Sequence, residues 1–161
     1  KGVERRFQYH GVFSTNCGKE FKLVDDYGHH PTEIKVTLEA CKQAFPNQKI
    51  LLVFQPHRFS RTRDLFEEFI KVLSEVNSLI LLPVYAAGED EIIGTDSKTL
   101  ARSIRILKKV NPFVVSNDIE AMDMIFSILE PGDILLLMGA GSVSALTNLI
   151  KNEVERGGYG K

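Results

Sequence analysis

Apolar residues follow two alternating patterns along the chain, which predict alternating strands and helices. Four runs are continuously apolar, as strands covered on both faces of a sheet must be: KILLVF (49–54), SLILLPVY (78–85), PFVV (112–115) and DILLLM (133–138). Other segments carry apolar residues every three or four positions, the period of a helix with one buried face. These stripes are Ile34, Leu38, Cys41 and Phe45; Leu65, Phe66, Phe69, Ile70 and Leu73; Ile119, Met122, Phe126 and Leu129; and Val143, Leu146 and Ile150.

The first 27 residues differ from the rest because they are extended throughout. RRFQYHGVF and EFKLVDDY flank the polar turn STNCGK, a pattern that predicts an antiparallel hairpin. Strand and helix then alternate about five times. We therefore expect one α/β domain over residues 1–161. It should be a three-layer, Rossmann-like fold with a mainly parallel sheet, right-handed crossovers and an N-terminal antiparallel hairpin strand.

Composition excludes several classes of partner. The chain has 161 residues, of which 43% are apolar and 25% charged, with a formal net charge of −1. This balance gives no reason to expect nucleic acid or an acidic membrane as a partner. The apolar runs are too short to span a bilayer, and the N-terminus lacks the apolar core of a signal peptide. Two cysteines, Cys17 and Cys41, form no disulfide framework, so we expect a reduced, cytoplasmic protein.

Reactive residues gather in the loops expected at one edge of the sheet. Ligands of α/β sheets bind outside the carboxyl ends of the strands. DDYGHHP (25–31) and QPHRFSRTR (55–63) follow the first two parallel strands, whereas AAGEDE, SND and GAGS follow the others. The loops at the opposite edge, FPNQK and EPGD, have ordinary turn chemistry. We therefore expect a site at the carboxyl edge, built mainly from the first two loops.

The DDYGHHP loop has more chemistry than a strand-to-helix turn requires. Gly28 allows a sharp exit from the strand, and Pro31 suits the first helical position. An aspartate or His30 could cap the helix, but two histidines are unexpected there because the helix dipole opposes imidazolium. Asp25 and Asp26 are neighbours on a strand end and should point in opposite directions, so only one should face a ligand.

The QPHRFSRTR loop places Arg58 and Arg61 at or just before the start of a helix, whose expected N-cap is Ser60 or Thr62. A helix N-terminus disfavours cations. The pair makes sense if an anion, either an α-carboxylate or a phosphate, is held between the guanidiniums and the helix amides. Arg63 lies further into the helix, and we expect it to form a surface ion pair.

Three further hypotheses have less support. GAGS (139–142) lacks the third glycine of a dinucleotide fingerprint, so we expect its glycines to let the backbone approach a ligand or a neighbouring helix. A metal site made of His29, His30 and His57 has no supporting ligand spacing, and His57 could line the site or be structural. A receiver-like phosphorylation domain is excluded because no aspartate ends the third strand and no lysine ends the fifth.

LVDDYGHHPTE and FQPHRFSRTRDL together closely resemble the C-terminal domain of the Mur ligase family, and within it the members that join L-alanine to UDP-N-acetylmuramate. The resemblance covers essentially the whole chain, from GVERRF to MGAGS. A related ligase that recycles whole peptides onto the same sugar is similar at the acid–histidine–histidine–proline turn. It is not expected to carry QPHRFSRTR.

This resemblance implies a three-domain enzyme of peptidoglycan synthesis. Its N-terminal domain binds UDP-N-acetylmuramate, its central domain binds ATP with Mg²⁺, and its C-terminal domain binds L-alanine and closes over the nucleotide. The muramoyl carboxylate forms an acyl phosphate with the γ-phosphate of ATP, and the alanine amine then attacks it. This chain has no GxxxxGK[ST] loop to cradle phosphates. We therefore expect a single domain that is inactive without the enzyme's other two domains.

The same resemblance implies roles for six residues. Asp26 would bind the ribose hydroxyls of ATP, and Arg6 would reach its phosphates after closure. The amino-acid pocket would comprise Tyr27, His29, Arg58 and Arg61, with the arginines on the carboxylate. A neutral His29 could accept a hydrogen bond from the incoming amine, but no residue is assigned as general base. The alternatives are the recycling ligase and a non-catalytic α/β module that binds an anionic small molecule.

Overall fold

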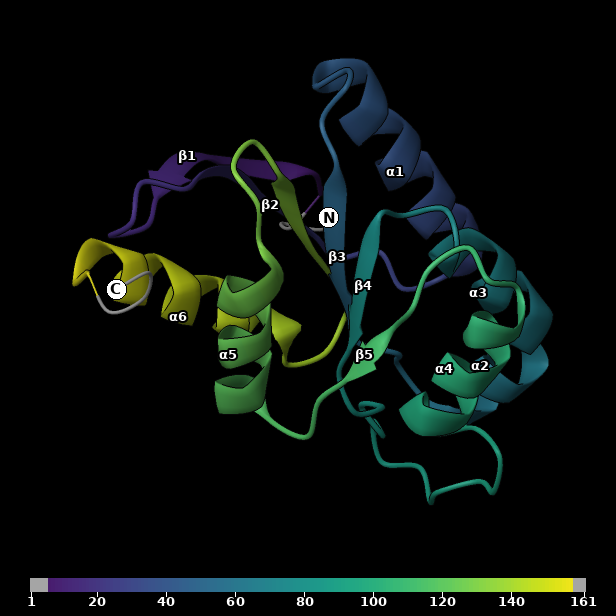
Figure 1. Ribbon diagram of the computed structural model, residues 1–161. Coiled ribbons are helices and arrows are strands. Elements are labelled where there is room, and N and C mark those ends of the chain that lie inside the picture. Colours follow the sequence, from purple (N-terminus) through teal and green to yellow (C-terminus); the bar gives the residue numbers. More distant parts are fainter. Residues whose placement is uncertain (1–5, 158–161) are drawn as a thin grey trace.

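A computed structural model describes residues 6–157, which form a six-stranded sheet between two layers of helices (Figure 1). The strands are β1 (Gln8–Ser14), β2 (Glu20–Asp26), β3 (Ile50–Phe54), β4 (Ser78–Leu81), β5 (Phe113–Val114) and β6 (Ile134–Met138). The helices are α1 (Pro31–Ala44), α2 (Phe59–Asp64), α3 (Phe66–Leu73), α4 (Ser97–Ile106), α5 (Asp118–Ile128) and α6 (Val143–Glu155).

The sheet confirms the predicted fold class. Its strand order is β1-β2-β6-β3-β4-β5; β1 is antiparallel to β2, and the other neighbours are parallel. Figure 1 shows α1 to α4 on one side of the sheet and α5 and α6 on the other. The last strand of the chain, β6, therefore lies between β2 and β3, the strands whose loops were expected to form the site.

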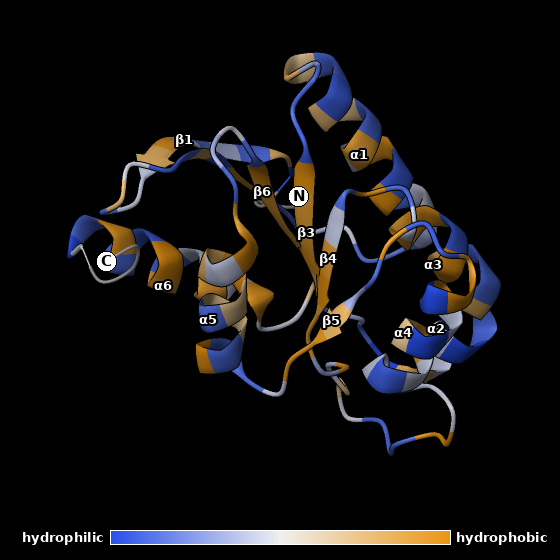
Figure 2. Cartoon of the chain, viewed as in Figure 1, coloured by the Kyte–Doolittle hydropathy of each residue, from blue (hydrophilic) through white to orange (hydrophobic). Residues whose placement is uncertain are grey.

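Two apolar cores hold the three layers together. In β6, Ile134 and Leu136 pack with the core under α1, α3 and α4, whereas Leu135 and Leu137 pack with the core under α5 and α6. This alternation follows from the two-residue period of a strand, and it explains why the parallel strands are continuously apolar (Figure 2). Each such side chain contributes about 1.5–3 kcal/mol on full burial.

The predicted hairpin is confirmed. Strand β1 pairs antiparallel with β2, with a register shift between Tyr9 and Gly11. Gly11 has a φ of +105°, a conformation that suits glycine at a bulge.

Among the described residues, no helix is both long enough and apolar enough to cross a bilayer.

Three of the predicted helical stripes are confirmed, and one needs correction. Helix α6 buries all three predicted residues, and α1 buries the first three of its four. The third stripe is wrong at Ile119, which is 73% exposed, because α5 turns Ala121, Met122 and Ile125 inward. The second stripe buries Phe69, Ile70 and Leu73, but the helix expected to start near Ser60 is divided into α2 and α3, which meet at Leu65 with φ −115° and ψ 25°.

The apolar run at 78–85 predicted a longer strand than the structure contains, since β4 ends at Leu81. Pro83 follows shortly after, and a proline has no amide hydrogen for a strand ladder. Helix α4 was not among the predicted stripes. Its buried Leu100 and Ile104 lie four residues apart, and Asp96 caps it by accepting from the Thr99 amide.

Candidate functional site

His30 and Glu33 build the start of α1. The His30 side chain accepts a hydrogen bond from the Thr32 amide at 3.1 Å, while Glu33 Oε1 accepts from the His30 amide at 3.1 Å. This reciprocal arrangement is a capping box, here with histidine as the cap. One of the two puzzling histidines is thus explained by helix capping, and His30 itself is exposed.

Gly28 is required by space. A Cβ atom at this position would lie 2.9 Å from Asp26 Oδ1 and 2.9 Å from Met138 Cε. Its φ is not among the positive values. The glycine therefore lets the loop pass close over the end of β6, which is a packing reason and not the conformational reason we expected from the sequence.

Asp25 and Asp26 engage different groups, as their adjacent positions on β2 predict. Asp25 Oδ2 lies 2.7 Å from His10 Nε2 on β1. Asp26 is 2% exposed. Its Oδ1 accepts from the Gly28 amide at 2.7 Å and its Oδ2 from the Phe7 amide at 2.8 Å. Asp26 thus ties the segment before β1 to the loop that begins the site, and its role toward a ribose stays a prediction.

Arg6 lies beside the same loop, at the first described position. Its Nη2 lies 3.1 Å from Glu33 Oε2, and its Nη1 lies 3.9 Å from Asp26 Oδ1. Burial alone would raise the pKa of Glu33. Hydrogen bonds from the backbone amides of His29 and His30 and from Arg6 outweigh this effect and lower the pKa to about 2. Glu33 is therefore ionised across the physiological range and connects Arg6 to the His29 loop.

Four aromatic rings form a row that crosses the carboxyl ends of β2, β3 and β4. Ring centroids lie 5.4 Å apart between Tyr27 and His29, 5.4 Å between His29 and His57, and 5.3 Å between His57 and Tyr85. The His57 and Tyr85 rings are stacked, with an interplanar angle of 15°. The structure thus brings the predicted Tyr27 and His29 together with His57, which lines the site.

The His29 ring is oriented by its own loop. Its Nδ1 lies 3.3 Å from the Tyr27 carbonyl oxygen. A carbonyl only accepts, so Nδ1 carries the proton in this contact and Nε2 has the lone pair in the neutral ring. Glu33 Oε1 lies 3.7 Å from the same Nδ1. The geometry leaves Nε2 as the nitrogen that could accept from an incoming amine.

Arg61 packs back on His57 from one turn along α2. Its Nη1 donates to the His57 carbonyl oxygen at 2.9 Å and lies 3.1 Å from His57 Nδ1. Burial lowers the pKa of His57, and the charges of His29, Arg61 and Arg58 lower it further, although Glu89 opposes them. A neutral His57 can accept from the guanidinium, so geometry and electrostatics agree.

Arg58 has an unusual backbone. It is the N-cap of α2, with φ 75° and ψ 136° and no side-chain cap, so the prediction of Ser60 or Thr62 as N-cap was wrong. Its amide donates to the Tyr85 carbonyl at 2.7 Å. A non-glycine residue with positive φ is strained and persists only where its surroundings hold it. Here the hydrogen bond to the Tyr85 carbonyl, in the loop after β4, holds Arg58 in this conformation at the site.

Glu89 is a site residue that the sequence did not indicate. Its Oε1 accepts from the Ser60 amide at 3.0 Å, its Oε2 accepts from the Ser60 hydroxyl, and Oε2 lies 3.7 Å from Arg58 Nη1. An internal carboxylate therefore occupies the Ser60 amide, which is one of the α2 amides expected to hold a substrate anion. The guanidiniums of Arg58 and Arg61 stay the predicted anion-binding groups.

Tyr85 is a second site residue that the sequence did not indicate. A Cβ atom at Gly141 would lie 2.6 Å from Tyr85 Cγ and 2.7 Å from Gln55 Oε1. Gly141 thus lets the backbone of the GAGS loop pass close to the side chains of Tyr85 and Gln55. This agrees with the close backbone approach that we expected for the glycines of this loop. The available signal was Tyr85 at the end of the apolar run 78–85, followed by the acids of AAGEDE, outside the two loops that we expected to form the site.

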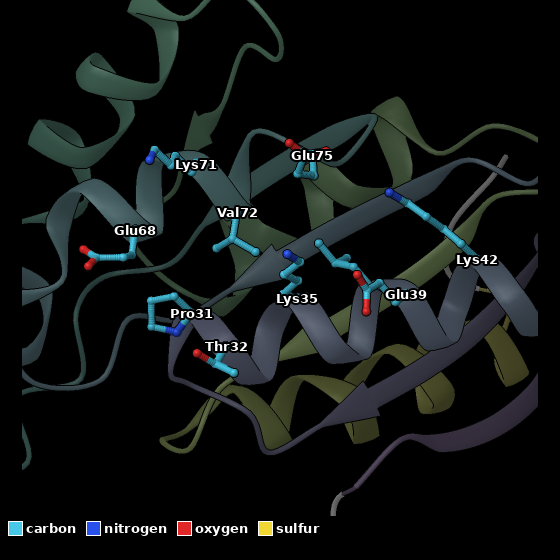
Figure 3. Close-up of a pocket in the computed structure, with 10 residues that line it drawn as sticks. Pro31, Thr32, Lys35, Glu39, Lys42, Glu68, Lys71, Val72 and Glu75 are labelled. Carbon is cyan, nitrogen blue, oxygen red and sulfur yellow. The ribbon is translucent and has the colours of Figure 1, made fainter.

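A separate groove of about 440 Å³ runs between α1 and α3 (Figure 3). Lysines and glutamates line both walls: Lys35, Glu39 and Lys42 from α1, Glu68 and Lys71 from α3, and Glu75 just after α3. This mixture has no dominant sign of charge, and none of the predicted ligand-binding residues line it. Over residues 6–157, no group of three or more His, Cys, Asp or Glu side chains is arranged to hold a metal ion.

Comparisons with known proteins agree with this arrangement. Residues 5–141 match the family described as "Mur ligase, glutamate ligase domain". The chain is 47% identical over 145 residues to UDP-N-acetylmuramate–L-alanine ligase of Nitrosomonas eutropha, covering 90% of the chain. It is 50% identical over 144 residues to the protein of that name from Neisseria meningitidis serogroup A, covering 89% of the chain. The chain spans 31% of the length of each relative.

A solved structure also matches. The crystal structure of UDP-N-acetylmuramate-alanine ligase MurC from Thermotoga maritima superposes with a TM-score of 0.72 at 26% sequence identity. The match covers 96% of this chain and 31% of that one. Both the sequence relatives and this structure thus correspond to the present chain over about a third of their length.

Proposed function

The chain belongs to the Mur ligase family, and from this premise we propose that it is the amino-acid-binding domain of an ATP-dependent ligase that joins L-alanine to UDP-N-acetylmuramate. In this proposal it is the C-terminal domain and works with an N-terminal UDP-sugar domain and a central ATP domain. One observation carries the proposal: His29 and Arg61, which follow two different strands, both contact His57, and the charge of Arg58 also reaches His57. The names of relatives at 47–50% identity support the choice of substrates.

The geometry suits capture of an amino acid. The guanidiniums of Arg58 and Arg61 offer several N–H donors for an α-carboxylate, in the fork geometry that matches it. His29 has Nδ1 engaged by the Tyr27 carbonyl, so its Nε2 is the nitrogen that can accept from the amine. Holding both ends of a small amino acid aligns its nitrogen for attack on an acyl phosphate, and this positioning can supply much of the rate enhancement.

ATP and Mg²⁺ are proposed to bind mainly to the central domain. Arg6 and Asp26 would contact the nucleotide, with Arg6 leaving Glu33 to reach the phosphates as the domains close. Arg6 is 48% exposed in its side chain, so it can exchange partners at small cost. Asp26 must become accessible at the same time, because the Phe7 amide now occupies its Oδ2. Cytoplasmic localisation and the lack of nucleic-acid or membrane partners remain predictions.

The test is an assay of the full-length ligase with ATP, UDP-N-acetylmuramate and a panel of amino acids. We expect ADP release that depends on both the sugar nucleotide and L-alanine. The 161-residue chain alone should fold and release no ADP above the buffer background. No alanine-dependent turnover by the full-length protein would refute the proposal, and turnover with a whole stem peptide in place of alanine would favour the recycling ligase.

A further inference from the structure

The charges around Arg58 do not match those of a simple anion site. Two arginines face one glutamate there, and Arg63, whose charge also reaches Glu89, is paired with Asp64 at 2.8 Å. The cluster of Arg58, Arg61 and Glu89 therefore carries one net positive charge. The hydrogen bond from the Ser60 hydroxyl lowers the pKa of Glu89, which therefore stays ionised at neutral pH. His57 adds no charge at that pH because burial and the neighbouring cations lower its pKa.

The Glu89 carboxylate is held in place. The Ser60 amide and the Ser60 hydroxyl bond its two oxygens. Its side chain is 22% exposed, against 44% for the Arg58 side chain that it faces. Glu89 therefore cannot swing away without losing two hydrogen bonds, whereas Arg58 keeps N–H groups directed to solvent. A ligand that approaches Arg58 meets a fixed negative charge beside it.

We propose that Glu89 is a specificity-determining residue that restricts the pocket to amino acids with a single carboxylate. This proposal rests on the proposed function, in which the arginines bind the amino acid. The α-carboxylate of a neutral amino acid balances the single positive charge of the cluster. An acidic side chain would bring a second carboxylate, which would have no cation to balance it and would be repelled by Glu89.

Glu89→Gln tests the charge while preserving the shape. The glutamine amide oxygen can still accept from the Ser60 amide, so the loop should stay in place. The variant removes one negative charge and leaves the cluster able to balance two carboxylates. A matched control is Glu91→Gln, an exposed acid two residues along the same loop. It removes the same formal charge from the protein without touching α2.

The experiment compares L-aspartate with L-asparagine in the full-length ligase, because the two differ in charge and hardly in size. For each we would measure kcat/KM and the inhibition constant against L-alanine. We expect Glu89→Gln to improve aspartate relative to asparagine at least tenfold in one of these measures, and Glu91→Gln to leave the ratio unchanged.

The outcomes separate this proposal from the proposed function. An aspartate-to-asparagine ratio within twofold of wild type in both measures would overturn the role of Glu89, even if alanine is used normally. An equal gain for both amino acids would also overturn it, because that result indicates added space and not a removed charge. Failure of the wild-type enzyme to use alanine would instead refute the proposed function.

Discussion

Arg61 and His57 are joined by a single guanidinium nitrogen. Nη1 of Arg61 lies 3.1 Å from Nδ1 of His57 and 2.9 Å from its carbonyl oxygen. Because a guanidinium only donates, Nδ1 of His57 must carry a lone pair, and the proton of the neutral ring lies on Nε2. Arg61 thus fixes the tautomer and orientation of the ring that lies between His29 and Tyr85.

Arg58→Lys should impair alanine use and spare the fold. A lysine ammonium cannot reproduce the planar fork of a guanidinium on a carboxylate. We expect kcat/KM for alanine to fall at least tenfold, or about 1.4 kcal/mol of transition-state stabilisation. The free energy of unfolding should change by no more than about 0.5 kcal/mol. Arg63→Lys, at an exposed position paired with Asp64, is the control and should affect neither quantity.

Arg58→Gly should separate stability from function more sharply. The φ of Arg58 is 75°, which glycine adopts without strain. Urea unfolding of the purified chain should show equal stability or a gain of up to about 1 kcal/mol, since strain relief offsets the greater freedom of the unfolded chain. Alanine use should fall further than in Arg58→Lys. A loss of more than about 1 kcal/mol would mean that the side chain supports the fold.

Glu33→Gln should remove an acid-sensitive part of the stability. The pKa of Glu33 is lowered from 4.5 to about 2 in the folded chain, so its stabilising contribution is complete above pH 4.5 and is lost as the pH falls toward 2. The variant should be less stable than wild type by about 1 kcal/mol at neutral pH, as for other helix caps. Urea unfolding at several pH values should show this difference shrinking in that window; a difference independent of pH would contradict the assignment.

Asp26→Asn should affect ATP more than alanine. An asparagine can accept from one of the Gly28 and Phe7 amides, but it directs an NH₂ group at the other. We expect the chain to lose roughly 1–3 kcal/mol of stability. In the full-length enzyme, the KM for ATP should rise about ten- to hundredfold, while the KM for alanine changes little. Neither KM depends on the fraction of enzyme that is folded. A rise in the KM for alanine alone would therefore show that Asp26 contacts alanine and not ATP.

The fold could be predicted from the sequence because its signals are local. Continuous apolar runs marked β3 and β6, and helical periodicity marked α1 and α6. The predictions were wrong where a local signal competes with the surroundings. Leu65 begins a predicted helical stripe and yet separates two helices. The position of such a break depends on tertiary contacts, which periodicity does not contain.

The site was only partly predictable. Residue types in two loops indicated the histidine turn and the Arg58–Arg61 pair, and the family resemblance added Tyr27 and the roles of all four pocket residues. The structure tests only their positions. Glu89 and Tyr85 were not found, because their loop reaches α2 through a backbone contact between His57 and Tyr85 that has no sequence signature. Which carboxylate faces which cation is decided by the path of a long loop, and composition does not specify that path.

The position of β6 has a consequence for the order of synthesis. Met138, in the last of the described strands, lies opposite both Asp26 on β2 and Phe54 on β3. Until residues 134–138 emerge from the ribosome, β2 and β3 share no neighbour and each leaves an edge open to pairing with other chains. Inserting a central strand so distant in sequence is a slow step of folding. The row of rings that spans the loops after β2, β3 and β4 is therefore completed only after residue 138 has been translated.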